Sequence, residues 1–182
     1  MLSIRKGGIG ILGDLDFLVE VDLQNEGYTV LDNIQITPSE LQQHRNKIAS
    51  FLTHEDKGVF IAEDESEHSQ VATIMYRIRN RNTIQHHEVF NKLDRSLFPP
   101  DGRFLEVFQL WVDPSYRRRG LATKLKRKLE EEAIKLIISL IYTHTEETNL
   151  VAIHLNERLG YHEIRRGSIW DKVVRVSLIK EL

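Results

Sequence analysis

The sequence contains no cysteine, which excludes disulfide bonds, thiolate nucleophiles and cysteine-ligated zinc. It also lacks any apolar run close to the roughly 18 residues that a membrane-spanning helix needs. Positive charge is not in excess, because 25 Lys and Arg residues face 27 Asp and Glu residues, for a formal net charge of −2. A dedicated nucleic-acid-binding domain is usually strongly basic, so this balance argues against nucleic acid as a partner.

The chain has 182 residues, enough for about one globular domain. Hydrophobic residues make up 41% and charged residues 29%, a composition that is ordinary for a folded domain and too apolar for wholesale disorder. No apolar stretch follows the first residues, as a signal peptide would require. We therefore expect residues 1–182 to form a single cytoplasmic domain with no membrane partner.

The first half of the chain predicts a strand, two helices and a hairpin. The expected elements are a strand at 2–5, an amphipathic helix at 14–23, a helix from 38 to about 54, and hairpin strands at 58–63 and 70–79. The polar face of the first helix includes Asp14 and Asp22. The second helix begins with Thr37 as N-cap, Pro38 in the first position and Glu40 three residues after the cap.

The second half alternates strands and helices and then ends in a hairpin. The expected elements are a strand at 104–112, a helix from 116 to about 136, a strand buried on both faces at 137–143, a helix at 150–159 that stops at Gly160, and strands at 161–166 and 172–179. We interpret residues 80–103 as a short helix or lid. The order at 104–159 implies a parallel pair, so we predict an α/β domain with a mixed, mostly antiparallel central sheet of about seven strands flanked by helices.

A first candidate phosphate loop is Gly8–Gly13, which matches G-x-G-x-x-G, with Asp32 19 residues after its last glycine. The strand before a dinucleotide loop should be apolar, but residues 4–7 read Ile-Arg-Lys-Gly. The following helix opens with Asp14 and Asp16, which place carboxylates where a pyrophosphate would bind. We therefore favour a glycine turn between strand and helix over a nicotinamide-dinucleotide site.

A second candidate is the loop Pro114–Thr123, which connects the apolar strand to the clearest helix. Residues 114–129 contain seven basic residues and no acidic one. The N–H groups at a helix N-terminus suit a pyrophosphate, and Gly120 would let the backbone approach the anion closely. A basic helix start is unfavourable without an anion, which itself indicates function.

Two other interpretations of this basic run stay open at this point. It could be a solvated helix face, or it could bind nucleic-acid phosphates. The pattern [QR]-x-x-G-x-[GA] alone is weak, and its placement between a strand and a helix is what gives it weight.

Two segments of the chain resemble the GCN5-related N-acetyltransferase (GNAT) family. The first is Leu110–Pro114 followed by Arg117-x-x-Gly120-x-Ala122, and the second is Asn149-x-x-Ala152 followed by Leu155–Tyr161. The expected order of strands and helices over nearly the whole chain is also similar to that of the family. The resemblance implies a splayed parallel strand pair and direct transfer of acetyl from acetyl-CoA to an amine.

The resemblance also assigns acetyl-CoA contacts position by position. Main-chain groups of the strand would pair with the pantetheine arm, and loop N–H groups would hold the pyrophosphate. The implied contact residues are Leu110, Trp111, Val112, Arg117, Arg118, Arg119, Gly120, Leu121, Ala122, Thr123, Asn149 and Asn156.

Glu106 is the candidate general base, which would help to deprotonate the attacking amine. A glutamate base occurs at a similar spacing in the histone-acetyltransferase branch of the family. Alternation places it on one face with Phe108 and Leu110, so we expect a lone carboxylate among apolar neighbours, with a raised pKa. The alternative is a carboxylate that pairs with Arg103 or with another surface cation.

Asn156 stands where many family members have a tyrosine that protonates the leaving thiolate. It shares a helix stripe with Leu155 and Leu159, so it should face inward and need partners. An amide cannot act as an acid, so water, Tyr142 or His144 would take that role. This departure leaves a non-catalytic acyl-CoA-binding domain as the alternative function.

The remaining features carry less information about function. His86-His87-Glu88 lacks the i,i+4 spacing of a helical zinc pair, so we expect no metal. Trp111 and Trp170 are expected to pack in the core or against the sheet. The acceptor, a small-molecule or peptide amine, would be framed by residues 24–37 and 80–103, and the sequence leaves a homodimer open.

Overall fold

The structure of the protein is a computed structural model that describes residues 1–28, 36–83 and 89–182. These residues divide into two compact units. The first comprises Met1–Tyr76 and Gln109–Leu125, and the second comprises Arg77–Phe108 and Lys126–Leu182. Expectations that fall on residues 29–35 and 84–88, among them Asp32 and the His86-His87-Glu88 run, lie outside the described residues.

Within the described residues, seven strands form one sheet in the order β1-β2-β3-β4-β5-β7-β6. The pairs β1–β2, β5–β7 and β6–β7 are antiparallel, whereas β4–β5 is parallel. The parallel pairing joins Leu105 to Ile141 and Glu106 to Tyr142, and both strands continue past these pairs. The predicted fold class, a mixed sheet with helices and a parallel pair, is confirmed.

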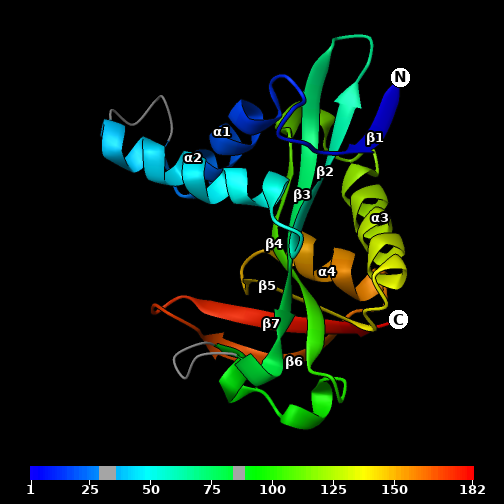
Figure 1. Ribbon diagram of the computed structural model, residues 1–182. Helices are drawn as coiled ribbons and strands as arrows, with labels where there is room; N and C mark the ends of the chain where they lie inside the picture. Colours follow the sequence, from blue (N-terminus) through cyan, green and yellow to red (C-terminus); the bar gives the residue numbers. More distant parts are fainter. Residues whose placement is uncertain (29–35, 84–88) are drawn as a thin grey trace. The chain divides into compact units, whose positions relative to one another are not determined.

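The described residues of the first unit contain all or part of four strands and three helices, of which α1 and α2 pack on each other. Its elements are β1 (Leu2–Lys6), α1 (Asp14–Asn25), α2 (Pro38–Thr53), β2 (Lys57–Asp64), the first part of β3 (Ser69–Asn80), the end of β4 (Arg103–Val112) and the start of α3 (Leu121–Lys135). Figure 1 shows α1 and α2 side by side. Leu18 and Val21 of α1 and Ile48 and Phe51 of α2 are buried.

Two acids of α1 are buried, contrary to the expectation that both lie on a solvated polar face. Asp14 is 0% and Asp22 is 2% exposed. Asp14 accepts hydrogen bonds from Arg5 and from Gln70. Asp22 contacts His44 and Lys47 of α2. Burial of a charge is tolerated where it is paired and hydrogen-bonded, and partners from other elements supply that here.

The start of α2 confirms the predicted capping box. The Thr37 hydroxyl accepts from the Glu40 N–H at 3.2 Å, and the Glu40 carboxylate accepts from the Thr37 N–H at 2.8 Å. Pro38 occupies the first helical turn. This reciprocal pair satisfies two donors that the helix itself leaves unbonded, so it defines where α2 begins.

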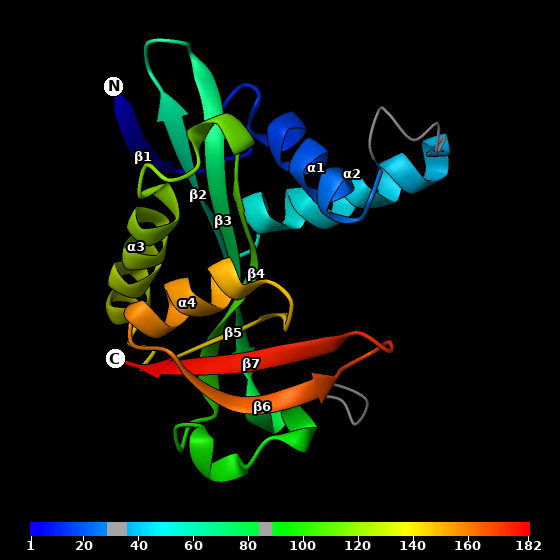
Figure 2. The ribbon, with the colours of Figure 1, turned by 180° about the vertical axis from the view of Figure 1, so that it is seen from behind.

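The second unit contains the C-terminal strands and the remaining parts of the elements that it shares with the first unit. It holds the end of β3, most of β4, most of α3, β5 (Leu140–Glu146), α4 (Leu150–Arg158), β6 (His162–Ser168) and β7 (Val174–Glu181). Figure 2 shows β6 alongside β7, as their antiparallel register requires.

The described residues of the 80–103 segment form three short 3₁₀ helices, at Arg81–Thr83, Val89–Lys92 and Arg95–Leu97. Their apolar side chains join one hydrophobic cluster with β4, β5 and β7, which comprises Val89, Phe90, Leu93, Phe98, Phe104, Leu140, Tyr142 and Ile179. Burial therefore fixes residues 89–98 within this unit. A lid function for the whole segment stays a prediction.

Helix α3 differs from the sequence expectation at both ends. It begins at Leu121 rather than Tyr116, because Arg118 and Gly120 adopt left-handed φ angles of 65° and 78°. At the end of the helix, Ile137 has a left-handed conformation with φ of 56°. The N–H of Ile138 donates to the Ala133 carbonyl at 2.9 Å. This Schellman-type cap takes Ile137 out of the strand that we expected to begin there.

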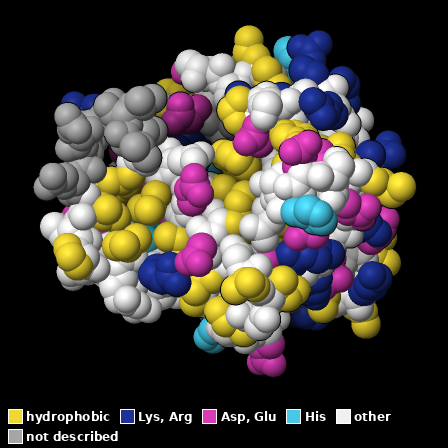
Figure 3. Space-filling view, turned by 90° about the horizontal axis from the view of Figure 1, so that it is seen from above, with side chains coloured by type: hydrophobic (Ala, Val, Ile, Leu, Met, Phe, Trp, Pro, Cys, Tyr) yellow, Lys and Arg dark blue, Asp and Glu magenta, His cyan; other side chains and the backbone are white. Residues whose placement is uncertain are grey.

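The described residues contain no helix that is both long enough and apolar enough to cross a membrane. On the face drawn in Figure 3, acidic, basic and hydrophobic side chains are interspersed.

Lys126 of α3 is a buried lysine in the second unit. It is 1% exposed, and its Nζ has no hydrogen-bond partner within the described residues. The ammonium lies 4.4 Å from the centre of the Tyr161 ring. Burial lowers the pKa of Lys126 to about 7, an effect that nearby Lys180 strengthens and Glu130 opposes.

This burial predicts a pH-dependent stability that Lys126→Met removes. Between pH 7 and 10.5 the unfolded chain binds a proton at residue 126 that the folded chain does not bind, so the free energy of unfolding rises with pH. Below pH 7 both states are charged and the full burial penalty remains. We expect Lys126→Met to flatten the slope and to stabilise the protein by about 2 kcal/mol at pH 6.

Urea unfolding at pH 6 and pH 9 measures this effect. Lys128→Met, which removes an exposed lysine of the same helix, is the matched control and should keep the wild-type slope. An identical pH slope in wild type and Lys126→Met would contradict the assignment.

Candidate active site

The loop between β4 and α3 forms a turn that ends in free helix N–H groups. A 3₁₀ turn at Pro114–Tyr116 leads into the left-handed residues Arg118 and Gly120. Lys124 is the first residue whose N–H bonds into the helix, to the Gly120 carbonyl at 3.0 Å. The N–H groups before it have no acceptor within a helix. Alternation of left- and right-handed residues turns successive N–H groups toward one concave side, which suits an anion.

Gly120 leaves open space at the end of this loop. A Cβ built at this position would meet no atom within 4 Å, so packing in the protein does not explain the glycine. Its φ of 78° does, since L residues seldom adopt that angle. Arg118 holds a similar angle despite its side chain, and such strain concentrates at functional sites. The loop therefore fits a phosphate group.

The other glycine loop is closed by the protein's own carboxylate. The Gly8 N–H donates to Asp14 Oδ2 at 3.0 Å, and Arg5 donates to both Asp14 oxygens at 2.8 and 2.6 Å. This carboxylate lies at the N-terminus of α1, where a bound phosphate would have to be. The geometry supports the glycine turn that we favoured for residues 8–13.

Glu106 does not lie alone among apolar neighbours, so that expectation is wrong. It is 4% exposed, and Arg77 of β3 donates to both its oxygens, from Nε at 2.5 Å and from a terminal nitrogen at 3.2 Å. Arg79 lies 3.8 Å from the same carboxylate. The alternative of a paired carboxylate holds, with Arg77 in the place of the expected Arg103.

Tyr142 and His144, the two candidate proton donors on β5, have different surroundings. The Tyr142 hydroxyl is 2.8 Å from Ser177 Oγ, and burial raises its pKa. His144 Nδ1 is buried with no partner among the described residues. Burial lowers the pKa of His144, and the nearby charge of Glu106 opposes part of this shift. The imidazole is therefore neutral at pH 7.

Trp170 is exposed rather than packed in the core, which corrects that expectation. Its indole is 64% exposed, and its ring lies edge-on to His144 with centroids 5.3 Å apart. Arg175 stacks over it at 4.2 Å. Trp111 of the first unit is half-buried and meets Phe17 edge-on at 5.8 Å, as a packing residue would.

The two asparagines of the second motif play different local parts. Asn149 is the N-cap of α4, and its side-chain oxygen accepts from the Ala152 N–H at 3.2 Å, which explains the Asn-x-x-Ala spacing. Asn156 is 4% exposed and faces inward as expected. Its Oδ1 has no hydrogen-bond partner within the described part of the chain. A buried, unsatisfied acceptor fits a ligand that brings an N–H donor.

Comparison with known proteins identifies the family of this chain. The model of the Acetyltransferase (GNAT) family matches residues 22–161, which is more than half of the chain. The chain belongs to the GNAT family.

Individual GNAT relatives are similar over different spans. A ribosomal protein bS18-alanine N-acetyltransferase from Escherichia coli strain K12 is 36% identical over 63 residues, which cover 34% of this chain and only 43% of that enzyme. The solved structure of Arabidopsis thaliana NAA60 in complex with acetyl-CoA has a TM-score of 0.72 at 15% identity and covers 100% of this chain and 99% of that one. The Escherichia coli ribosomal-protein-S18-alanine N-acetyltransferase structure has a TM-score of 0.62 at 16% identity, with 100% and 94% covered.

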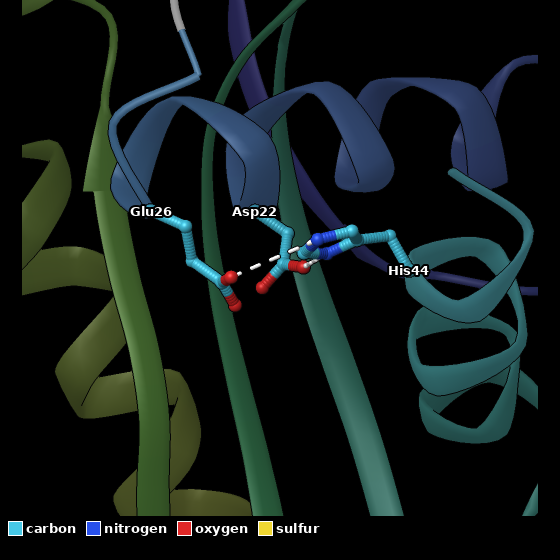
Figure 4. A group of neighbouring side chains, drawn as sticks. All are labelled: Asp22, Glu26 and His44. Atoms are coloured by element: carbon cyan, nitrogen blue, oxygen red, sulfur yellow. Dashed lines mark hydrogen bonds and ion pairs between the residues drawn. The ribbon is translucent and has the colours of Figure 1, made fainter. Parts of the chain in front are cut away.

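A charged cluster between α1 and α2 of this GNAT protein escaped the sequence analysis. His44 Nδ1 is 2.7 Å from Asp22 Oδ2, and Glu26 lies on the other side of the imidazole at 3.7 Å, as Figure 4 shows. These three side chains could together hold a metal ion. Lys47 already supplies a cation, because its ammonium is 2.7 Å from both carboxylates. We therefore interpret the cluster as an ion-pair network that joins the two helices.

Removal of Arg77 should destabilise the protein by leaving Glu106 buried beside Arg79 alone. We expect Arg77→Met to lower the free energy of unfolding by about 2 kcal/mol, since loss of one partner strands a buried charge. The double variant Arg77→Met/Glu106→Leu should regain much of that loss. Arg166→Met, which breaks the exposed pair with Glu163, is the control and should change stability by about 0.5 kcal/mol. Equal effects of the two single variants in urea unfolding would refute the pairing.

Proposed function

We propose that this chain is an acetyl-CoA-dependent N-acetyltransferase that transfers acetyl directly to the α-amine of a polypeptide, with both substrates bound. The observation that carries the proposal is the loop after β4, where left-handed Arg118 and Gly120 lead into the N-terminus of α3. Membership of the GNAT family supports acetyl transfer. The names of the ribosomal-protein-alanine N-acetyltransferase relatives support an N-terminal amine.

The residues of this loop would hold the phosphates of acetyl-CoA. The N–H groups from Arg118 to Thr123 are the donors for the pyrophosphate, and the space beside Gly120 admits it. Main-chain groups of Leu110–Val112 would bind the pantetheine arm. In the second unit, the unpaired Oδ1 of Asn156 can accept a hydrogen bond from a bound amide.

The acceptor must be a neutral amine, which favours an α-amine over lysine. A free α-amine has a pKa near 7.7–8.0, so roughly a quarter to two fifths of it is neutral at pH 7.5. For a lysine side chain with a pKa near 10.4 the neutral fraction is roughly 0.1%. An enzyme with a modest base can therefore use an N-terminus efficiently.

His144 is the general base in this proposal, and Glu106 supports it. Bound acetyl-CoA supplies the thioester carbonyl. As the amine nitrogen forms the new C–N bond, its proton passes to the neutral imidazole of His144, and the electrons of the C–S bond leave with the sulfur as a thiolate. Glu106 is engaged by Arg77, and its charge favours the imidazolium that results. This assignment moves the base role from Glu106 to its neighbour.

Release of CoA thiol from acetyl-CoA near pH 8 tests the function. A panel of peptides with a free N-terminus should react, whereas the same peptides with a blocked N-terminus and an internal lysine should react at least 10-fold more slowly. Gly120→Glu should abolish binding and turnover, because it places a carboxylate at the phosphate position. The matched control Gly10→Glu alters the other glycine loop, where a Cβ also has open space, and should stay active. Binding of acetyl-CoA without turnover on any amine would refute the enzymatic proposal.

Replacement of His144 should affect turnover and not cofactor binding. We expect His144→Gln to lower kcat about 100-fold with unchanged acetyl-CoA affinity. Burial lowers the pKa of His144. In the pH profile of kcat, the wild type should therefore show a decrease below pH 6.5 that is absent in His144→Gln. His162→Gln removes an exposed histidine on β6 and serves as the control. An unchanged kcat would return the base role to Glu106.

A further inference from the structure

Tyr116 lies between an acid of the β2–β3 hairpin and an arginine of the phosphate loop. Its hydroxyl donates to Asp64 Oδ2 at 3.0 Å. The guanidinium carbon of Arg119 lies 4.7 Å from the centre of the Tyr116 ring. All three residues belong to the first unit. They form a chain of contacts from the end of β2 to the residue just before Gly120.

Tyr116 is held through its backbone N–H and through its hydroxyl. Its N–H bonds to the Asp113 carbonyl at 2.9 Å, and the Asp113 N–H bonds to the Val71 carbonyl of β3 at 2.9 Å. Asp64 stays ionised, because hydrogen bonds from Ser66 above all, and from Tyr116, lower its pKa to about 2. The phenol therefore donates to a full negative charge, which makes a strong hydrogen bond. The ring is a fixed surface beside the loop.

Arg119 differs from its neighbour Arg117. The Arg117 side chain turns back to β4, where its Nε donates to the Val112 carbonyl at 3.2 Å. Arg119 is exposed, and within the described residues no hydrogen bond from its guanidinium is found. A free arginine samples many rotamers, but a cation held over an aromatic ring loses part of that freedom. The stack on Tyr116 keeps the donors of Arg119 together beside the phosphate loop.

We propose that Asp64 and Tyr116 are positioning residues that hold the Arg119 guanidinium for a phosphate of bound CoA. The inference rests on the proposed function, since it concerns the same cosubstrate. Arginine recognises phosphate through paired N–H donors, and this recognition depends on the direction of the planar group. A guanidinium that is already oriented loses less freedom when the phosphate binds. CoA offers a pyrophosphate and a 3′-phosphate, and either can be the partner.

Binding of CoA and of 3′-dephospho-CoA, measured by calorimetry, tests the proposal. We expect Arg119→Gln to weaken CoA binding about 10-fold. Tyr116→Leu should weaken CoA binding nearly as much. It should add little to the loss in the Arg119→Gln background, because Tyr116 acts through Arg119. Tyr116→Phe keeps the ring but loses the hydrogen bond to Asp64, so it should weaken CoA binding by part of the Tyr116→Leu loss. Arg127→Gln, an exposed arginine of α3, controls for loss of net positive charge.

The outcomes separate the two proposals and the two phosphates. If Arg119→Gln loses affinity for CoA but not for 3′-dephospho-CoA, Arg119 binds the 3′-phosphate. If it loses affinity for both ligands equally, Arg119 binds the pyrophosphate. Either result supports the inference. Wild-type affinity in Arg119→Gln, or additive losses in the double variant, would overturn the positioning role. Failure of the wild type to bind either ligand would instead refute the proposed function.

Discussion

The parallel alignment of β4 and β5 is the constraint on which the candidate site depends. Antiparallel neighbours can be joined by a tight turn, but parallel neighbours need a crossover that carries the chain back to the starting edge. Here α3 is that crossover, and its buried stripe of Leu121, Leu125 and Leu129 packs it in place. The chain must therefore enter a helix soon after β4 ends. Free N–H groups at that entry follow from helix geometry, and the loop sequence decides what they bind.

The two glycine loops show how one carboxylate decides whether such a loop can bind a phosphate. Both lead from a strand into a helix through a left-handed glycine, Gly13 before α1 and Gly120 before α3. At α1, Asp14 supplies the negative charge from within the chain, and Arg5 neutralises it. At α3 the first turn has no acid. A literal match to a phosphate-binding pattern is thus less informative than the charge of the first helical turn.

Local signals in the sequence were enough to predict the order of the elements and several of their ends. The start of α2 is determined by Thr37, Pro38 and Glu40. The contacts between Thr37 and Glu40 join residues three positions apart, so the sequence alone predicts them. The start of α3 was predicted five residues too early, because hydrophobic spacing does not reveal the left-handed backbone of Arg118. Similarly, Ile137 is a β-branched residue in a position usually given to glycine.

The surroundings of the site residues could be predicted less well, because they depend on distant parts of the chain. Arg77 is separated from Glu106 by 29 residues and Asp64 from Tyr116 by 52. Nothing in the spacing of these residues signals that they meet. The inward direction of Asn156 followed from its helix stripe, whereas its unsatisfied oxygen became evident only once its neighbours were placed.

The ion-pair network of Asp22, Glu26, His44 and Lys47 has a consequence for how this family member can diversify. It joins the last turn and the C-cap residue of α1 to α2 through side-chain contacts. The two helices therefore do not rely on the connection between them to stay together. Substitutions, insertions or deletions in that connection can accumulate with little effect on the helix pair. Selection can thus act on this connection almost independently of the scaffold that carries it.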